Sequence, residues 1–324
     1  MGRVPRPGGR PAPRRFRTFP KSLHFLLHST DPASYPSRMT VQGGPAFAVS
    51  VDVEDYFQVQ AFAARISLKD WGSFPSRVAD NTERLLDLFD ETHAKGTFFI
   101  LGWVARRHPE LVRHIASRGH EVASHGMTHT MITELSPSEF RAEAMESRLL
   151  LEDLGGGRVI GYRAPSYSVN RETLWALEVL RDSGYEYDSS IYPIRRRRYG
   201  YPEGPLVPAR IAAGDRDIAE FPLPSIPFGP LRFPVLAGAY LRLLPAWVSL
   251  AAVEYHRRRR IPLVVNVHPW EIDPGQPSVG FSRLAKWAHY ARLDQTDRIL
   301  RRVLQLGGFS TIEARLRELS LLTP

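Results

Sequence analysis

The sequence predicts an α/β fold built on a parallel β-sheet, and two patterns indicate this class. From Ala46 onward, short runs of β-branched and aromatic residues alternate with longer segments that have helical periodicity and capping residues. This alternation is typical of right-handed βαβ units, whose strands run parallel in one sheet. In addition, several of the predicted strands end at a polar residue capable of chemistry, as expected where parallel strands share one functional face.

Local patterns predict the elements of the first half. Asp80 can act as the N-cap of a helix, because Glu83 occupies the capping-box position. Pro109 suits the first turn of another helix. In chain order, the expected elements are a strand at 47–52, a helix from 80 to a stop at 96, a strand at 97–101, a helix at 109–119 and a strand at 121–125.

The second half contains the clearest helix start in the sequence. Ser136 is a good N-cap, Pro137 fits the first helical position, and Glu139 completes a capping box, which predicts a helix to about Leu154. The elements expected after it are a strand at 159–163, a helix at 170–183, strands at 185–188 and 219–221, a helical region within 236–255, a strand at 263–268 and a helix at 294–307.

Five polar residues stand at the carboxyl ends of separate predicted strands. They are Asp52, His125, Arg163, Asp188 and His268. In a parallel barrel these ends share one face, so residues that are far apart in the sequence should converge on one pocket. This convergence favours an enzyme.

The spacing of two histidines suggests a metal centre in that pocket. His125 and His129 stand four residues apart and can direct two ring nitrogens at one ion. The chain contains no cysteine, so any metal must be held by His, Asp or Glu. Two histidines and a carboxylate leave positions open for water and a substrate oxygen, which suits metal-assisted hydrolysis.

The remaining polar residues suit proton transfer around such a centre. Asp52 can act as the base that takes a proton from water, and Arg163 can hold Asp52 through a charge-assisted pair. His268 can act as the acid for the leaving group, with Asp188 orienting its ring and raising its pKa.

Five segments resemble, in order, the five motifs of the polysaccharide deacetylase family, carbohydrate esterase family 4, also called the NodB homology domain. They are VDVEDYF (51–57), SHGMTH (124–129), RAPSY (163–167), YDSS (187–190) and VNVH (265–268). The resemblance covers about residues 47–279, and its specificity lies in the ordered set. The first motif, the stretch GAYLRLLP (238–245) and the extended C-terminal region are similar to the subgroup associated with exosortase/PEP-CTERM exopolysaccharide gene clusters.

This resemblance implies a distorted (β/α)7-type barrel and metal-dependent removal of N-acetyl groups from N-acetylhexosamine units of a polysaccharide. Zinc is the expected ion, with cobalt, nickel or manganese as alternatives. The resemblance makes Asp52 the base, Arg163 its tether, His268 the acid and Asp188 the partner of the acid. It also makes both histidines of SHGMTH, His125 and His129, metal ligands. It also implies that a backbone N–H near Ser166 or Tyr167 helps to hold the oxyanion.

The sequence departs from the family pattern at two positions. Val53 stands where a second, adjacent aspartate is usual, so the third metal ligand must be Glu54 or Asp55. Strand alternation points Glu54 to the side of Asp52 and favours Glu54, with Asp55 as an N-cap or as a partner fixing a histidine ring. A turn after the strand would instead bring Asp55 to the metal. Gly126 stands where Ser or Thr is usual.

The sequence also offers candidate substrate contacts and alternative functions. Tyr240 and Arg242 could contact sugar, while Trp270 could form a hydrophobic wall beside the acid or simply pack. The basic runs 195–198 and 257–260 could bind an anionic glycan or a phospholipid surface, or be solvated faces. The alternative activity is hydrolysis of small amide or ureide C–N bonds, with or without metal. A binding module without activity is disfavoured by the intact polar set.

The charge distribution separates a tail from the predicted barrel. Residues 1–38 contain eight Lys/Arg and one Asp, so most of the net charge of +9 lies there. We expect residues 1–45 to be a disordered Pro/Arg-rich tail, with Met39 as the favoured start of translation. We expect residues 46–280 to form the barrel and residues 281–324 to form a helical extension packed on it.

No nucleic-acid partner, signal peptide or transmembrane segment is expected, which leaves a cytoplasmic or a periplasmic, membrane-peripheral location. The oligomeric state is left open.

Overall fold

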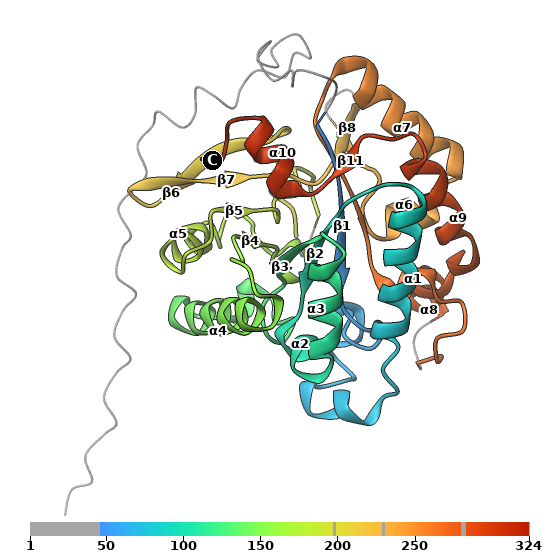
Figure 1. The fold of residues 1–324 in the computed structure, drawn as a ribbon, viewed down its shortest axis with the longest axis horizontal. Coiled ribbons are helices and arrows are strands. Elements are labelled where there is room, and N and C mark those ends of the chain that lie inside the picture. Colours follow the sequence, from blue (N-terminus) through green and yellow to red (C-terminus); the bar gives the residue numbers. More distant parts are fainter. Residues whose placement is uncertain (1–45, 197–198, 229–230, 280–282, 324) are drawn as a thin grey trace, which may run out of the picture. The chain divides into compact units, whose positions relative to one another are not determined.

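The computed structural model describes residues 46–196, 199–228, 231–279 and 283–323 (Figure 1). The tail predicted to be disordered lies outside the described residues. Within them, no helix is both long enough and apolar enough to cross a lipid bilayer.

The centre of the fold is a curled sheet in which, among the described residues, seven parallel strands follow one another in the order β10-β1-β2-β3-β4-β5-β7. Their bounds are Leu263–Val267, Phe47–Val53, Thr97–Ile100, Glu121–Ser124, Gly161–Tyr162, Tyr187–Asp188 and Arg216–Glu220. β6 (Ala209–Ala213) extends the edge as an antiparallel partner of β7. β10 and β6 are the two ends of the row, so the sheet is an open form of the expected distorted (β/α)7-type barrel.

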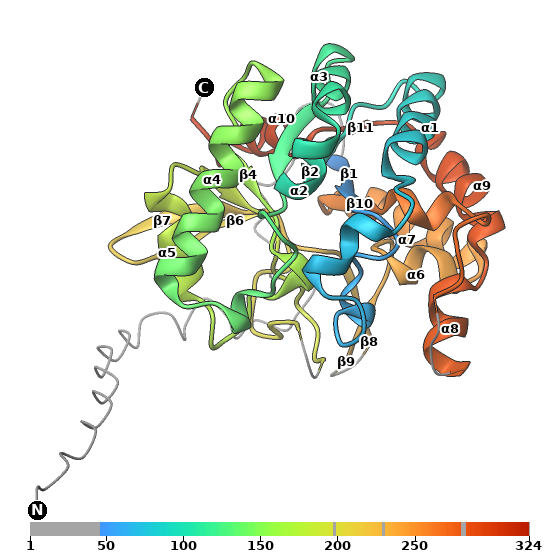
Figure 2. The same ribbon diagram turned by 90° about the horizontal axis from the view of Figure 1, so that it is seen from below.

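Helices surround the sheet (Figures 1 and 2). In chain order they are α1 (Val78–Glu91), α2 (Gly102–Arg107), α3 (Pro109–Ser117), α4 (Pro137–Gly155), α5 (Trp175–Asp182), α6 (Ala239–Leu243), α7 (Ala246–Arg259), α8 (Arg283–Tyr290), α9 (Leu293–Leu304) and α10 (Ile312–Glu318). Short 3-10 turns occur at Gln60–Phe62, Leu68–Ser73, Ile132–Glu134, Pro165–Tyr167 and Pro269–Ile272. A two-stranded hairpin is formed by β8 (Ser225–Phe228) and β9 (Leu231–Pro234).

The core covers both faces of β1, which lies between β10 and β2 in the sheet. Every residue of β1 is buried, because helices and the barrel interior cover its two faces. On the α1 side, Leu85 and Phe89 pack into the same core cluster as Val49 of β1 and Phe98 of β2. Full burial of a Leu or Phe side chain is worth about 1.5–3 kcal/mol, so this contact anchors the strand that leads to Asp52.

The first helix begins at a different residue from the one predicted. α1 starts at Val78, so Asp80 lies in its first turn and is not the N-cap. The carboxylate of Asp55 accepts hydrogen bonds from the backbone N–H groups of Arg77 (3.0 Å) and Val78 (3.3 Å), which caps the helix from a distant segment. By contrast, α4 begins as predicted, because the reciprocal bonds of the Ser136 and Glu139 capping box are both present.

The C-terminal third contains elements that local patterns did not predict. The helical region within 236–255 is divided at Pro245 into α6 and α7. β6 and the β8–β9 hairpin were not predicted, and neither was β11 (Phe309–Ser310), which pairs in parallel with β1. The end of the chain therefore contributes a strand to the central sheet.

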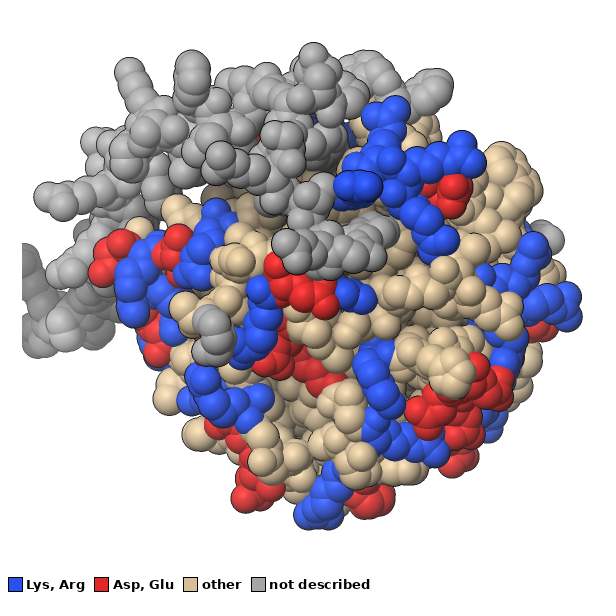
Figure 3. Space-filling model, turned by 45° about the horizontal axis from the view of Figure 1, so that its top comes forward, with Lys and Arg blue, Asp and Glu red and all other residues tan. Residues whose placement is uncertain are grey.

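Charged side chains are mixed on the face that Figure 3 shows, where Lys and Arg lie among Asp and Glu. In the basic run at the end of α7, residues 257–260, three arginines have partners within the protein. Arg258 pairs with Glu254 at 2.6 Å, Arg257 donates to the Leu306 carbonyl, and Arg259 lies over the Tyr255 ring. Cations at a helix C-terminus also interact favourably with the helix dipole.

Candidate active site

The carboxyl ends of the parallel strands bring the main candidate residues together. Asp52 lies in β1 and Glu54 follows it, while His125, Arg163 and His268 come directly after β3, β4 and β10. All five are buried or nearly so. Residues that are more than 200 positions apart in the chain are thereby placed within hydrogen-bonding reach, as for Asp52 and Asn266 (2.9 Å).

Glu54, His125 and His129 form a group that could hold a metal ion. One ligand atom from each lies within 4.8 Å of the other two, and all three residues are buried. The Nδ1 atom of His125 is 2.8 Å from the Arg163 carbonyl, so it acts as the donor and leaves Nε2 as the nitrogen free to bind a metal. His129 Nε2 lies 2.8 Å from Glu54 Oε2.

The chemistry of this group fits a divalent cation. Among the described residues, no group donates a hydrogen bond of normal geometry to Glu54 Oε2, although the atom is buried. Burial disfavours ionisation of Glu54, but His129, His268 and His125 outweigh it and hold the pKa of Glu54 far below its usual range. Burial lowers the pKa of His125 to about 4, so its ring is neutral, as a metal ligand must be.

Asp55 lies outside the metal group because its carboxylate is used elsewhere. One oxygen accepts hydrogen bonds from the Ser76 hydroxyl (2.7 Å) and from the first backbone N–H groups of α1, and the other accepts from the Tyr56 N–H (3.1 Å). Asp55 is thus the cap of α1. The side-chain alternation along β1 and beyond places Glu54, and not Asp55, beside the histidines.

Gly126 is explained by the backbone between the two histidines. Its φ is +78°, a left-handed conformation that favours glycine, and a Cβ there would lie 3.2 Å from the Tyr162 hydroxyl. The turn at Gly126 directs the chain so that His129, itself at φ +54°, returns towards His125. The two rings are in edge contact, with centroids 5.3 Å apart.

Asp52 is held through both carboxylate oxygens. Arg163 Nη1 donates to Oδ1 at 2.8 Å, which is the contact that the sequence predicted, and Asn266 Nδ2 donates to Oδ2 at 2.9 Å. Burial raises the pKa of Asp52, but the charges of Arg163, His125 and His268 overcome this effect and leave the pKa below its usual value. The carboxylate is therefore ionised and fixed in orientation.

Ser50 and Asn266 are site residues that the sequence reasoning did not single out. The Arg163 Nη1 also donates to Ser50 Oγ and to Asn266 Oδ1, both at 2.7 Å, and Arg163 is fully buried. A signal was present in the sequence, because Ser50 interrupts the apolar run of β1 before Asp52, and Asn266 is the single polar residue of β10. A buried polar group of this kind needs partners, so such positions mark a polar network.

The partner of His268 is Glu271, and the predicted role of Asp188 is wrong. His268 Nδ1 lies 2.9 Å from Glu271 Oε2, whereas Asp188 accepts from the Ser190 hydroxyl (2.6 Å) and shares a hydrogen bond with Glu220. Asp188 ends β5 beside the end of β7, so it faces Glu220. Its burial raises its pKa to about 6.

Glu271 also explains the charge of the histidine. Burial disfavours the imidazolium form of His268, but the hydrogen bond and charge of Glu271, aided by Glu54 and Asp52, raise the pKa of His268 to about 9. His268 Nε2 lies 3.6 Å from Asp52 Oδ2 and 3.7 Å from Glu54 Oε1. A protonated imidazole therefore faces both carboxylates.

Arg242 does not contact solvent as a sugar-binding residue would. It is 1% exposed, and its guanidinium donates to Glu271 (3.3 Å) and to the carbonyls of Ala288 and Ala291. The prediction of a sugar contact is therefore wrong, because tertiary packing buries this residue behind Glu271.

Trp270 lies beside the acid. Its ring stacks on the His268 ring, with centroids 5.2 Å apart, and its Nε1–H donates to Glu54 Oε1 at 3.1 Å.

Ser166 and Tyr167 form a strained turn after β4. Both have positive φ, 54° and 53°. The Tyr167 backbone N–H donates to the Ala164 carbonyl at 3.0 Å, which leaves Ser166 as the better candidate for an oxyanion donor. The Tyr167 hydroxyl accepts from Asn266 at 2.7 Å, so this side chain joins the network around Asp52.

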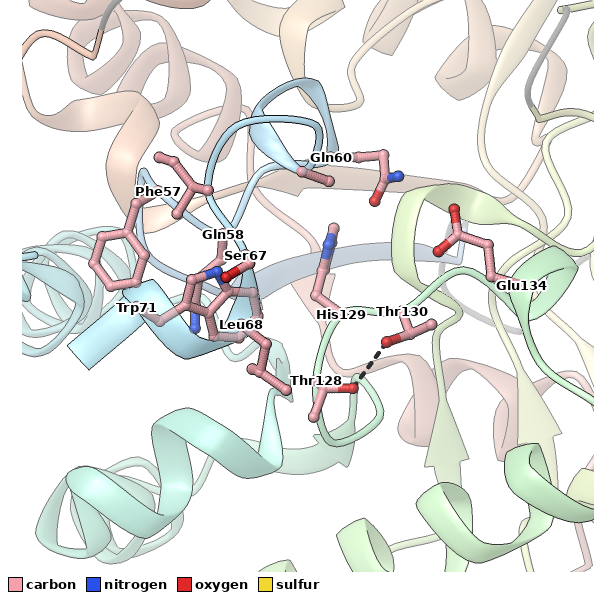
Figure 4. A pocket seen from close by; sticks show the side chains of 12 residues that line it. Phe57, Gln58, Gln60, Ser67, Leu68, Trp71, Thr128, His129, Thr130 and Glu134 are labelled. Atoms are coloured by element: carbon pink, nitrogen blue, oxygen red, sulfur yellow. Dashed lines mark hydrogen bonds between the residues drawn. The ribbon is translucent and has the colours of Figure 1, made fainter. Parts of the chain in front are cut away.

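A cavity of about 130 Å³ lies beside His129 (Figure 4). The segment 57–71 lines one side with Phe57, Leu68 and Trp71, and the segment 128–134 lines the other. The walls are mixed, since aromatic and aliphatic side chains are interspersed with the amides and hydroxyls that binding sites for polar ligands use.

Comparisons with known sequences divide the chain in two. Residues 70–187 match the polysaccharide deacetylase family, and residues 189–317 match a domain of unknown function, DUF3473. A peptidoglycan deacetylase-like protein of Gibberella zeae is 33% identical over 132 residues, 40% of this chain and 38% of that protein. A peptidoglycan-N-acetylglucosamine deacetylase of Bacillus cereus is 30% identical over 98 residues (30% and 36%), and a chitooligosaccharide deacetylase of Rhizobium leguminosarum is 39% identical over 66 residues (20% and 31%). The chain thus spans less than half the length of these relatives.

Comparisons with solved structures support the fold. A Mycobacterium smegmatis protein assigned to the polysaccharide deacetylases has a TM-score of 0.57 at 22% identity, with 90% of this chain and 94% of that one covered. The allantoinase PuuE also has a TM-score of 0.57, at 14% identity, with 93% and 97% covered. Both likenesses establish a shared barrel architecture.

Proposed function

We propose that the protein, whose residues 70–187 form a polysaccharide deacetylase domain, is a metal-dependent hydrolase that removes N-acetyl groups from N-acetylhexosamine units of a polysaccharide. One observation carries the proposal. Asp52, held by Arg163, and His268, held by Glu271, lie next to each other and beside the group formed by Glu54, His125 and His129. A base, an acid and a metal-binding group are what hydrolysis of an unactivated amide requires.

In this proposal Asp52 is the general base. Its Oδ1 is bound by Arg163 and its Oδ2 by Asn266, so the carboxylate is kept ionised and cannot rotate away from the water that it deprotonates. The Oδ2 atom also faces His268, which makes it the oxygen nearest to the reacting groups. The hydroxyl formed from water attacks the amide carbon, and the carbonyl oxygen takes the negative charge.

His268 is the general acid in the second half of the reaction. With its pKa raised to about 9, the ring holds a proton at neutral pH and can donate it from Nε2 to the amide nitrogen as the C–N bond breaks. Glu271 fixes the opposite nitrogen, so Nε2 is kept directed at the site. Acetate and a free amine leave, and the proton taken by Asp52 is balanced by the one that His268 gives.

Glu54, His125 and His129 are the residues that would hold the ion. When bound, a divalent metal such as zinc lowers the pKa of water and polarises the amide carbonyl. Trp270 holds the other oxygen of Glu54 at 3.1 Å, and the Arg163 carbonyl holds His125, so two of these side chains are oriented by neighbours.

The glycan substrate is inferred from the sequence matches, since fold likeness alone does not discriminate. The barrel resembles a deacetylase-type structure and an allantoinase equally well by TM-score. The sequence matches are to proteins named as deacetylases of peptidoglycan and chitooligosaccharide. Together with the resemblance of the first motif to exopolysaccharide-associated sequences, they favour an acetylated polysaccharide over a small ureide.

Acetate release tests the proposal directly. Purified protein is incubated with N-acetylated oligosaccharides and, in parallel, with allantoin, before and after treatment with a chelator. The proposal expects acetate from at least one glycan, loss of the activity with chelator and recovery on adding a divalent metal. Hydrolysis of allantoin without acetate release from any glycan would favour the small-substrate alternative.

A further inference from the structure

Four tyrosines form a connected cluster next to the candidate active site. The members of this tyrosine cluster are Tyr167, Tyr192, Tyr199 and Tyr240. The Tyr192 ring lies 5.6 Å from Tyr167, 6.3 Å from Tyr199 and 6.4 Å from Tyr240, measured between ring centroids. Tyr192 is buried beneath the others, which are partly exposed. The cluster therefore presents aromatic surface to solvent from three separate segments of the chain.

The tyrosine cluster is continuous with the catalytic groups. The Tyr167 hydroxyl accepts from Asn266, and Asn266 donates to Asp52. On the other side, Gly238 precedes Tyr240 by two residues and lies against His268, because a Cβ at Gly238 would be 3.3 Å from the His268 ring. A ligand bound on the cluster would thus be a neighbour of the amide that the site hydrolyses.

Arg196 lies at the outer end of the cluster. Its guanidinium donates two hydrogen bonds to the Tyr240 hydroxyl, at 3.2 and 3.0 Å, and lies 5.8 Å from the centre of that ring. The Tyr199 hydroxyl is 3.3 Å from the same oxygen. Two neutral phenols therefore hold the cation in place.

The charge of Arg196 is not neutralised within the described part of the chain. No carboxylate there forms an ion pair with it, whereas other exposed arginines of this region do pair, as Arg171 does with Glu203 (2.6 Å). A positioned guanidinium without an internal anion is well suited to an external carboxylate or phosphate, which it can bind through two parallel N–H groups.

We propose that Arg196 and the tyrosine cluster form a subsite for an anionic substituent, a carboxylate or a phosphate, carried by a sugar unit adjacent to the one that is deacetylated. This inference rests on the proposed function and makes the substrate an acidic glycan. The aromatic surface packs against the apolar face of the sugar ring, and the guanidinium binds the anion. The anchored position of Arg196 limits the side-chain entropy that is lost when the anion binds.

The test compares Arg196→Gln with Arg195→Gln. Arg195 is the adjacent exposed arginine, for which no hydrogen bond or ion pair is found among the described residues, so its variant removes the same charge from the same loop. Three probes are used: a chitin hexasaccharide, which is neutral, a hyaluronan hexasaccharide, which alternates N-acetylglucosamine with a uronic acid, and a phosphate-substituted N-acetylhexosamine oligosaccharide. Affinity is measured by calorimetry and kcat/KM by acetate release.

Arg196→Gln is expected to weaken binding of one acidic probe about tenfold, the size of one charge-assisted hydrogen bond, and to raise KM more than it lowers kcat. The probe that loses affinity identifies the anion. Binding of the neutral probe should not change, and Arg195→Gln should resemble wild type throughout. Arg196→Lys should fall in between, because it keeps the charge and loses the fork.

Equal affinities of Arg196→Gln and Arg195→Gln for both acidic probes would overturn the subsite while leaving the proposed function intact. Conversely, absence of acetate release from every probe by the wild type would count against the proposed function. The calorimetric comparison would still decide the subsite in that case. Melting temperatures of the two variants show whether Arg196 serves only to stabilise the loop, in which case Arg196→Gln melts lower and binds every probe normally.

Discussion

Replacing Glu271 by Gln should move the alkaline limit of activity. His268 acts as an acid only while protonated, and its pKa of about 9 means that kcat/KM should fall as the pH rises through that value. Glu271 is the main favourable cause of the raised pKa, through a buried hydrogen bond of 2.9 Å to Nδ1. A charge-assisted hydrogen bond is worth about 1.5–3 kcal/mol, and one pKa unit corresponds to about 1.4 kcal/mol. The alkaline limb should therefore shift down by about one to two units.

The assay is the pH profile of acetate release for wild type, Glu271→Gln and Asp188→Asn. A bound cation near Glu54 will lower the limb in all three proteins, so the difference between them is the quantity of interest. Asp188→Asn is the matched control, because this carboxyl faces Glu220 and Ser190 and not the histidine. The reasoning is refuted if Asp188→Asn moves the limb and Glu271→Gln leaves it in place.

Three further variants test separate parts of the site. Asp52→Asn should keep its metal content and lower kcat at least about 100-fold, since general base catalysis contributes about 10²–10⁴; most of the activity remaining would disprove the base assignment. Trp270→Phe removes the N–H that holds Glu54 while keeping an aromatic ring, so metal affinity should drop about tenfold in a competition titration with a chelator. An unchanged affinity would show that this bond does not orient the ligand. Gly126→Ala should destabilise the protein by about 1–3 kcal/mol in urea unfolding, because it places a side chain at φ +78°; a neutral effect would mean that the turn relaxes.

The parts of the site that the sequence could predict depend on local rules. Alternation along a strand was sufficient to favour Glu54 over Asp55, because a period of two is a property of the strand itself. The contact between Arg163 and Asp52 followed from the convergence of strand ends in a parallel barrel. The first argument needs only the strand itself, and the second needs only the order of the elements along the chain.

The parts that failed depend on tertiary placement. Asp55 caps a helix that starts more than 20 residues later. The N-cap role predicted for Asp80 is therefore filled by a carboxylate from a distant segment. The partner predicted for His268 is Asp188, which ends a separate strand, whereas the actual partner, Glu271, stands three residues after the histidine on a 3-10 turn. That spacing was visible in the sequence. The burial of Arg242 was not visible, because its partners come from the end of α8, from the residue that follows α8 and from the turn that carries Glu271.

The central claim, that Glu54 and the two histidines hold an ion needed for acetate release, is tested by metal reconstitution. Chelator-treated wild type, Glu54→Gln and Asp55→Asn are titrated with zinc, cobalt, nickel and manganese, with the bound ion counted by plasma mass spectrometry and acetate release measured in the same samples. Wild type and Asp55→Asn should each bind about one ion per chain and regain activity, although Asp55→Asn should be less stable because it weakens the cap of α1. Glu54→Gln should bind little metal and stay inactive. Full activity of metal-free wild type, or loss of the ion from Asp55→Asn but not from Glu54→Gln, would contradict the account.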